Sequence, residues 1–500
     1  MTPKGYKSIA IASICAVYIA VRLWGLTSSC LWFDEVFSVH AAEHPWNLLF
    51  WFVAQDLIHP PLFYVLLKIW TNLGGESLFW LRSFSVLFAV LAVFPFLHLC
   101  KELKIKFPAA AIALALFAVN GSLIKYAQEL RMYSLLLFLG LMSMWLFSRF
   151  YYRGKNIWVL TLVNILLVYT HYFGWFTVAA EVLAILLFQR VKIRHVLIMS
   201  GIAIVTYIPW LIAVFRASNA GAEVTQNIGW IATPGLKSIP DFIIDGIEPF
   251  YFQASSADPS TLAFITVPLA VLIVIASIIF FAGWRKMEDR SAFYLLAIFC
   301  GVPIVIAFSV SWIMPVSIWG SRHLILAFPS LAIITAVFLT EIPGRVFRAV
   351  LISGVGLIAV AAFAARMQQP QPEYIWCEWE KAAAQIPPGE TSTVYVFEEL
   401  IAYHLWFSLR DKPAVKVVMV RGSGVPEDTA YFLPRGFDGV EKTDGTAIKD
   451  DEIWLAFRTQ QYHEKHPPLS VLLSKGYSVA EIKEFGTGPE KAYLVKAVKN

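Results

Sequence analysis

The stretch Leu31-Trp32-Phe33-Asp34-Glu35 follows the first apolar segment of the chain and places two adjacent carboxylates directly after two aromatic residues. Because desolvating an ionisable group at membrane depth is costly, such groups usually have a function or a charged partner. An alternative interpretation is that Asp34 only caps the helix that follows. Polar residues that return at the same membrane face further along the chain favour the functional interpretation.

The composition around this stretch is that of a membrane protein. The 500 residues are 58% hydrophobic and 15% charged, and the mean hydropathy is +0.64. These values exclude a soluble protein of this size. Aromatic residues make up 15% of the chain, which suits belts at the two water interfaces. We expect the lipid bilayer as a partner and no nucleic acid.

Eleven segments are long and apolar enough to cross a bilayer, which takes about 17–25 residues. They are 8–26, 77–99, 108–124, 130–148, 156–170, 173–189, 195–215, 261–284, 291–313, 323–341 and 346–366. A further apolar stretch, 61–73, is short for a span and contains Lys68. It suits a helix that lies in the interface.

The distribution of Lys and Arg gives the orientation. When 61–73 is not counted as a span, Lys and Arg concentrate in one set of loops, which the positive-inside rule assigns to the cytoplasm. The N-terminus is then cytoplasmic, and the outer regions are 27–76, 217–260 and the tail. We therefore predict a transmembrane domain over 1–366.

The tail, 367–500, alternates strand and helix signals and predicts a small extracytoplasmic α/β domain. We expect strands at 393–397, 415–420, 453–458, 477–485 and 492–498, and helices at 373–385 and 398–409. The fold class is thus an α-helical polytopic membrane protein with a C-terminal α/β domain. The five cysteines show no metal spacing and no disulfide framework, although Cys30 and Cys377 could pair if both lie on an oxidising side.

Polar side chains from separate loops return at the outer membrane face. They are His59, the group Lys125, Glu129, Arg131 and Tyr133, the pair His171-Tyr172, and the pair Arg322-His323. Each alone could be an ordinary interfacial side chain. Together they predict a water-exposed cavity in which carboxylates and cations converge.

Two charged residues lie inside predicted spans. Glu181 could belong to a proton relay or to a hydrogen-bonded structural network, and we favour the structural role. Arg82 could reach the interface or neutralise an acid of the first loop.

Several of these motifs together resemble GT-C fold glycosyltransferases. They are Asp34-Glu35, His59-Pro60-Pro61-Leu62, Leu81-Arg82-Ser83, Gln128-Glu129-Leu130-Arg131-Met132-Tyr133-Ser134 and Thr170-His171-Tyr172-Phe173. Within that group the chain is most similar to bacterial enzymes related to protein O-mannosyltransferases and lipid A aminoarabinose transferases. The resemblance covers residues 1–215 well, the other spans loosely, and the tail only in general type.

The resemblance implies a donor in which polyprenyl phosphate carries one sugar, used outside the bacterial inner membrane. It implies that Asp34 is the catalytic base and that Glu129 organises the donor phosphate or a metal. The aminoarabinose transferases carry an Arg shortly after the Asp-Glu pair and a Lys before Pro-Pro. This chain has Val36-Phe37 and His59 there, which leaves Lys125, Arg131 and Arg322 as phosphate ligands.

A direct displacement follows from this donor. Phosphate is a good leaving group and needs charge neutralisation, so one carboxylate base suffices and the anomeric centre inverts. Asp34 would be that base, and Arg131, His59 and Arg322 would bind the phosphate. Glu35 and Glu129 would orient these cations. Alternatively, Asp34 and Glu129 would be the ligands of a divalent cation (Mg²⁺, Mn²⁺ or Zn²⁺). The acceptor hydroxyl could belong to a glycan, a lipid or a protein.

Two other classes of protein remain as alternatives. A secondary transporter would show paired repeats and broken helices with polar groups near the midplane, whereas here the charges gather at one face. A membrane-anchored assembly protein with an α/β interaction domain would tolerate neutralisation of the outer acids.

Overall fold

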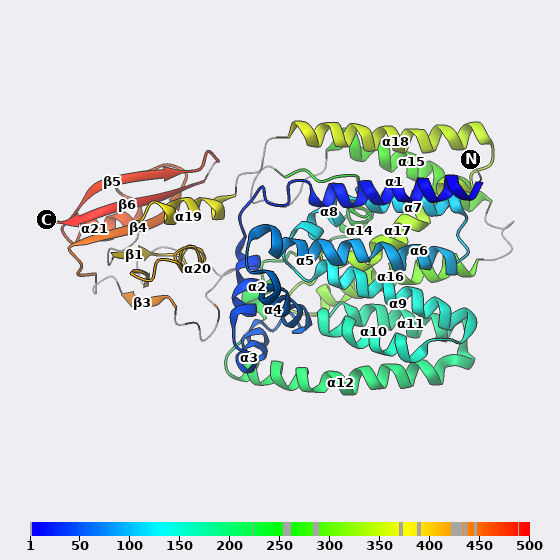
Figure 1. Ribbon diagram of the computed structural model, residues 1–500, viewed down its shortest axis with the longest axis horizontal. Helices are drawn as coiled ribbons and strands as arrows, with labels where there is room; N and C mark the ends of the chain where they lie inside the picture. Colours follow the sequence, from blue (N-terminus) through cyan, green and yellow to red (C-terminus); the bar gives the residue numbers. More distant parts are fainter. Residues whose placement is uncertain are drawn as a thin grey trace.

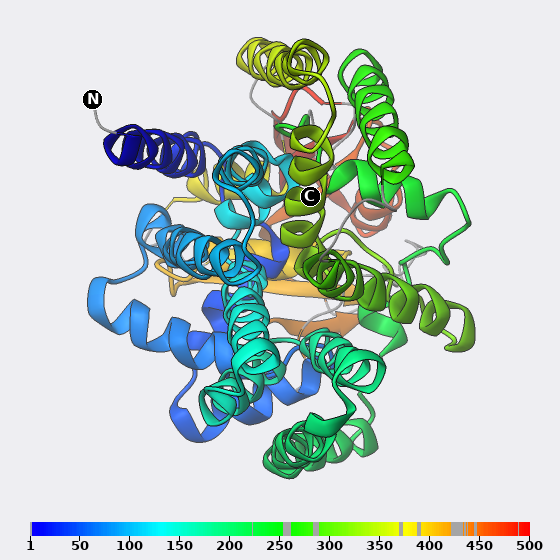
Figure 2. The ribbon, with the colours of Figure 1, turned by 90° about the vertical axis from the view of Figure 1, so that its right-hand side faces the viewer.

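The computed structural model describes residues 3–222, 224–253, 262–283, 290–369, 374–387, 392–421, 434, 437, 439–444, 448–488 and 490–500. A bundle of long helices carries an α/β domain at one end, and the N-terminus lies at the opposite end of the bundle (Figure 1). Figure 2 looks along the long helices and shows the strands behind the bundle. Residues 223 and 254–260 of the predicted outer loop 217–260, and residue 373 of the predicted helix 373–385, lie outside the described residues.

The helices of the bundle occur where the hydropathy pattern predicted spans. They are α1 (Pro3–Leu23), α5 (Leu78–Leu91), α6 (Val93–Glu102), α7 (Phe107–Val119), α9 (Tyr133–Arg153), α10 (Ile157–Thr170), α11 (Gly174–Phe188), α12 (Ile193–Asn219), α15 (Ala263–Ala282), α16 (Ser291–Ile313), α17 (Phe328–Thr340) and α18 (Arg345–Gln368). Within the described part of the chain, seven helical segments are long and apolar enough to cross a membrane, and α5 and α6 together form one of them. The other predicted spans are shorter apolar helices. The predicted class, a polytopic helical membrane protein, is confirmed.

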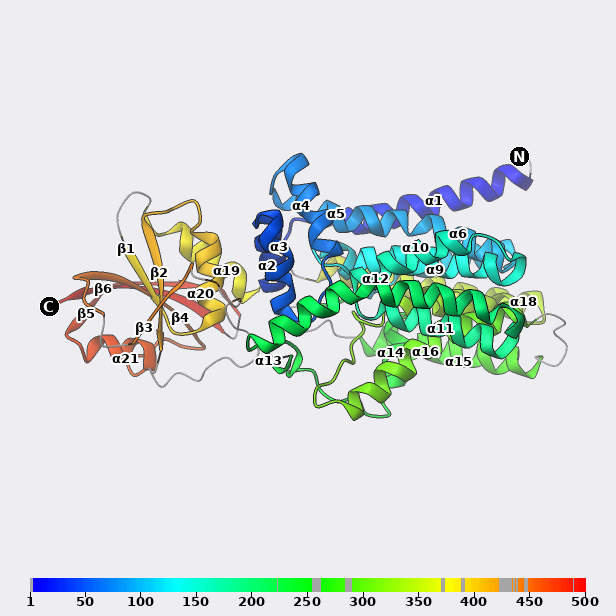
Figure 3. The same cartoon turned by 90° about the horizontal axis from the view of Figure 1, so that it is seen from below.

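Shorter helices occupy the connections between the long ones. They are α2 (Phe33–Glu43), α3 (Trp46–Asp56), α4 (Leu62–Gly74), α8 (Gly121–Gln128), α13 (Thr225–Ile228) and α14 (Ser238–Asp245). The helices α2, α3 and α4 lie at the end of the bundle that faces the α/β domain, and α2 and α3 cross the direction of the long helices (Figure 3). The first loop is therefore built into the junction between the two parts of the molecule.

A disulfide joins this first loop to the start of the α/β domain. Cys30 and Cys377 are bonded, with their Cα atoms 5.4 Å apart. The expectation that the cysteines form no disulfide framework is thus wrong for this pair, because the tail folds back onto the first loop. Two bonded residues lie on one side of a membrane, so the chain between them crosses an even number of times. The ten spans predicted after the first satisfy this parity, whereas counting 61–73 as an additional span would break it.

The α/β domain contains one six-stranded sheet in the order β3-β2-β1-β4-β6-β5. Its strands are β1 (Ser392–Val396), β2 (Val415–Arg421), β3 (Glu441–Asp444), β4 (Glu452–Thr459), β5 (Tyr477–Phe485) and β6 (Lys491–Lys499). The first four strands pair in parallel, and β6 pairs antiparallel with β4 and β5. Five strands match the prediction. The short strand β3 was missed because its sequence Glu-Lys-Thr-Asp has no apolar alternation.

Helices cover both faces of this sheet. The helices are α19 (Ile375–Ala384), α20 (Glu399–Ser408) and α21 (Pro467–Leu473). Alternate residues of a strand point to opposite faces, and accordingly Val394 and Val396 share a core with α19 and α20, whereas Tyr395 belongs to the core on the α21 side.

The domain is docked on α2 by buried and ionic contacts. The Nδ1 atom of His40 lies 2.8 Å from the Tyr403 hydroxyl. Arg410 forms ion pairs with Glu43 at 2.6 Å and with Glu76 at 3.0 Å. The helix that carries Asp34 in its first turn is therefore held from the α/β side as well as from the bundle.

The carboxyl group of Glu181 has partners inside the bundle. Ser143 on α9 and Asn164 on α10 lie 2.6 and 2.7 Å from its two oxygens and 2.7 Å from each other. This three-helix network supports the structural interpretation of Glu181.

Candidate active site

A cavity of about 550 Å³ lies where the end of the bundle meets the α/β domain. The predicted residues that line it are Asp34, Glu35, His59, Lys125, Glu129, Arg131, Tyr133, Arg322 and His323. They come from the first loop and α2, the stretch from the end of α8 to the start of α9, and the segment before α17. The cavity thus brings together most of the polar residues that the sequence placed at one membrane face.

Glu35 is fully buried and forms a bidentate ion pair with Arg82. Its two oxygens lie 3.0 and 2.8 Å from Nε and Nη2 of Arg82. The same carboxylate accepts hydrogen bonds from the backbone N–H of Leu130 at 2.7 Å and of Trp32 at 3.2 Å. One side chain of the first loop therefore fixes α5 and the segment that leads to Arg131. The expectation that Arg82 neutralises a loop acid is confirmed.

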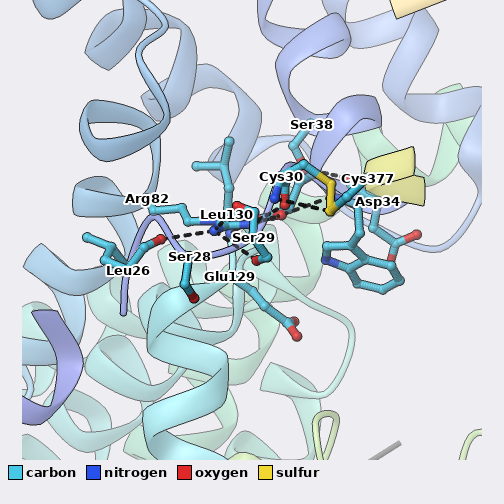
Figure 4. Close-up of polar contacts among 12 residues, drawn as sticks. Leu26, Ser28, Ser29, Cys30, Asp34, Ser38, Arg82, Glu129, Leu130 and Cys377 are labelled. Carbon is cyan, nitrogen blue, oxygen red and sulfur yellow. Dashed lines mark hydrogen bonds and ion pairs between the residues drawn. A yellow bond between two sulfur atoms is a disulfide. The ribbon is translucent and has the colours of Figure 1, made fainter. Parts of the chain in front are cut away.

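Arg82 in turn holds the backbone of the first loop. Its guanidinium donates to the carbonyl oxygens of Leu26, Ser29 and Cys30 at 2.7–2.9 Å (Figure 4). An irregular loop has carbonyl groups without secondary-structure partners, and this guanidinium satisfies three of them. The loop therefore has a fixed course up to the start of α2.

Asp34 stands in the first turn of α2, and its side chain is 25% exposed. Its Oδ2 atom lies 3.7 Å from Nη2 of Arg131. Arg131 is buried and is oriented by hydrogen bonds from Nη1 to the Asp34 carbonyl oxygen at 3.1 Å and to the Ser38 hydroxyl at 3.2 Å. A carboxylate with access to the cavity thus lies beside a cation of fixed position.

His59 supports Arg131 from the other side. Its Nδ1 atom lies 2.7 Å from Asp56, and its Nε2 atom lies 3.4 Å from Nη2 of Arg131. Burial, together with the charge of Arg131, lowers the pKa of His59, so the ring is neutral at neutral pH. A neutral ring that donates its Nδ1 hydrogen to Asp56 presents Nε2 as an acceptor to Arg131.

Two further cations face the cavity. Lys125, in the last turn of α8, lies 3.9 Å from Glu129, the residue directly after this helix. Burial raises the pKa of Glu129, and the charge of Lys125 opposes this shift. The guanidinium of Arg322 lies 5.2 Å from the centre of the Trp230 ring, a distance at which a cation is attracted to the ring face.

His171 and Tyr172 do not line the cavity, although they were expected among its lining residues. The ring of His171 lies 5.6 Å from that of His59 and 5.7 Å from that of His323. The Tyr172 hydroxyl donates to the Leu57 carbonyl oxygen at 3.0 Å. Both residues lie one layer behind the wall, because the turn after α10 packs beneath His59. Burial lowers the pKa of His171 well below its usual value, so this ring is neutral as well.

No family model and no curated protein matches the sequence. The structure is similar to ArnT from Cupriavidus metallidurans bound to undecaprenyl phosphate, with 12% identity, a TM-score of 0.59, and coverage of 99% of this chain and 98% of that chain. It is also similar to the apo state of the same protein, with 11% identity, a TM-score of 0.62 and the same coverage. The chain has the GT-C fold. This confirms the fold that the sequence motifs predicted.

Some residues of the GT-C cavity were not singled out from the sequence. The amide of Gln128 donates to the Trp24 carbonyl oxygen at 2.7 Å and accepts a hydrogen bond from the Tyr251 hydroxyl at 3.1 Å. Arg366, at the end of α18, lies over the rings of Trp24 and Tyr251. Gln128 stands inside the recognised motif and could have been found there. Arg366 and Tyr251 carry no local signal.

The carboxylates proposed as metal ligands each face a cation instead. Asp34 is next to Arg131 and Glu129 is next to Lys125. Across the described ranges, no group of three or more His, Cys, Asp or Glu side chains converges in a way that could hold a metal ion. The donor set of this GT-C cavity therefore does not fit a metal held by protein ligands.

Breaking the Glu35–Arg82 pair should destabilise the protein strongly. We expect Arg82→Met to cost about 3–5 kcal/mol, because it leaves a buried carboxylate without its counter-ion. A thermal unfolding curve in detergent measures the loss as a lower Tm. The matched control is Lys106→Met in the exposed pair Lys106–Glu341 (side chains 73% and 37% exposed), which should cost less than about 1 kcal/mol. Equal shifts in the two variants would contradict the role of the buried pair.

Proposed function

We propose that this protein is a glycosyltransferase that moves one sugar from a polyprenyl-phosphate donor to an acceptor hydroxyl at the extracytoplasmic face of a bacterial inner membrane. The observation that carries the proposal is the cavity in which Asp34 meets Lys125, Arg131 and Arg322 within a GT-C fold. The bound undecaprenyl phosphate of the similar ArnT structure supports the class of donor.

The three cations neutralise the phosphate of the donor. Arg131 and Arg322 can each bind two phosphate oxygens, and Lys125 adds a point charge. His59 positions Arg131 rather than binding phosphate itself, because its two ring nitrogens face Asp56 and Arg131. Negative charge develops on the phosphate as the bond to the sugar breaks, and preorganised cations stabilise that charge best in the transition state.

Asp34 is the base. The acceptor oxygen forms a bond to the anomeric carbon, the bond from that carbon to the phosphate oxygen breaks, and the acceptor proton passes to a carboxylate oxygen of Asp34. The products are the glycosylated acceptor, with inverted configuration, and polyprenyl phosphate. Glu35 is a positioning residue, because it is fully buried and both its oxygens are engaged by Arg82 and backbone N–H groups.

The disulfide supports the proposed orientation. Structural disulfides persist in oxidising compartments such as the bacterial periplasm and are rare in the cytosol. The Cys30–Cys377 bond therefore favours an extracytoplasmic position for the first loop, the cavity and the α/β domain. The concentration of Lys and Arg in the opposite set of loops favours the same orientation.

Replacing the base tests the reaction directly. We expect Asp34→Asn to lower the rate of donor cleavage by about 10²–10⁴-fold, because the amide cannot take the acceptor proton. The assay offers purified protein a panel of short-chain polyprenyl-phosphate sugars and follows release of polyprenyl phosphate. The exposed Asp241→Asn on α14 is the matched control and should keep the wild-type rate. Normal turnover by a folded Asp34→Asn variant would remove Asp34 from the mechanism.

The raised pKa of Glu129 should be visible in the pH dependence of the reaction. Because burial raises its pKa, the carboxylate that pairs with Lys125 takes up a proton at a higher pH than an exposed glutamate does. We therefore expect kcat/KM to fall with decreasing pH through a midpoint above the ordinary glutamate value of about 4.3. In Glu129→Gln the midpoint of this acid limb should move to lower pH, because the variant has no titrating group at this position. An unchanged acid limb in the variant would assign the titration to another group.

Chelation tests whether the cations act without a metal ion. We expect EDTA treatment to leave the rate of donor cleavage unchanged, because Arg131, Arg322 and Lys125 already supply the positive charge. Loss of activity that Mg²⁺, Mn²⁺ or Zn²⁺ restores would instead assign a divalent ion to Asp34 and Glu129.

A further inference from the structure

Three aromatic rings form one wall of the cavity beside the base. Trp32, from the first loop, and Tyr374 and Trp376, from the start of the α/β domain, all line the same cavity as Asp34. The rings of Tyr374 and Trp376 stack with centroids 5.0 Å apart and an interplanar angle of 10°. The ring of Trp32 lies 6.2 Å from that of Trp376. We refer to these three side chains as the aromatic shelf.

The aromatic shelf is fixed by covalent and ionic contacts. The disulfide partners Cys30 and Cys377 stand two residues before Trp32 and directly after Trp376. The backbone N–H of Trp32 is also held by Glu35 at 3.2 Å. A surface that is already ordered loses little conformational entropy when a ligand binds, so the shelf is preorganised.

The polar groups around the shelf suit a ligand with many hydroxyl groups. The Nε1 hydrogen-bond donor of Trp32 is buried and has no partner among the described residues. Buried polar groups in native proteins are nearly always satisfied, so this donor takes a water or a ligand oxygen as its acceptor. Arg458 and Glu490, from the α/β domain, line the same cavity and form an ion pair at 3.3 Å. Both are able to form hydrogen bonds with hydroxyl groups.

We propose that the aromatic shelf binds a sugar ring of the acceptor, so that the acceptor is a glycan and not a peptide. This inference rests on the proposed function and names the acceptor of that same site. The C–H groups on one face of a pyranose carry partial positive charge and pack on the negative face of an aromatic ring. The acceptor must lie next to the base that takes its proton, and the shelf begins two residues before Asp34. The cations for the donor phosphate, by contrast, all belong to the bundle.

The test separates acceptor binding from donor binding. Purified full-length protein receives the donor that the panel identifies, together with cellobiose, maltose, α-1,2-mannobiose or a threonine-containing peptide. We expect one of the disaccharides, and not the peptide, to accelerate donor cleavage. In Trp376→Ala the disaccharide concentration for half-maximal rate should rise roughly tenfold, and Trp376→Phe should restore most of the loss. Binding of polyprenyl phosphate should not change in either variant.

Controls keep the outcomes distinct. Trp158→Ala, at an exposed tryptophan of α10, should behave as wild type, and a thermal unfolding curve with the wild-type Tm verifies that Trp376→Ala is folded. Acceleration by the peptide, or equal half-maximal disaccharide concentrations in wild type and Trp376→Ala, would overturn the inference and leave the proposed function intact. Absence of donor cleavage under every condition would overturn the proposed function itself.

Discussion

The buried ion pair between Glu35 and Arg82 is the constraint on which the cavity depends. Desolvating two charges in the junction is repaid only when further hydrogen bonds satisfy both groups. Here such hydrogen bonds are present: Arg82 donates to the carbonyl groups of the first loop, and Glu35 accepts from the backbone N–H of Leu130. The pair thus connects the first loop, α5 and the segment at Leu130. The position of Arg131, one residue later, follows from that contact. So does the start of α2, where Asp34 faces the cavity.

The positive charge around the cavity does not depend on histidine side chains. His59 and His171 are neutral at neutral pH because both rings are buried, and His59 also lies beside the charge of Arg131. Most of the positive charge therefore comes from the guanidinium groups of Arg131 and Arg322, which stay charged at every physiological pH. A site of this kind keeps its attraction for an anionic lipid headgroup over a wide pH range.

The sequence was sufficient to predict the parts that depend on local pattern. Hydropathy and loop charge predicted the bundle helices, and alternation predicted five of the six strands. The motif around Glu129 and Arg131 could be placed with Asp34 because both stand at the same membrane face. The Cys30–Cys377 disulfide was predicted only as a possible pair, and Arg366 and Tyr251 were not placed, because their contacts arise only when distant segments fold together. His171 was predicted to line the cavity but lies behind the residues that line it. Membrane depth alone does not distinguish these two positions.

The Cys30–Cys377 bond also imposes an order of events on biosynthesis. Its partners are separated by 347 residues, and every helix from α2 to α18 lies between them. Synthesis proceeds from the N-terminus, so Cys30 leaves the ribosome early and keeps its thiol until the last helix has been inserted. The bond then closes only after the last of these helices has been made, and only when an even number of them cross the membrane. Oxidation of this pair is therefore a covalent record that both ends of the helical part reached the same side.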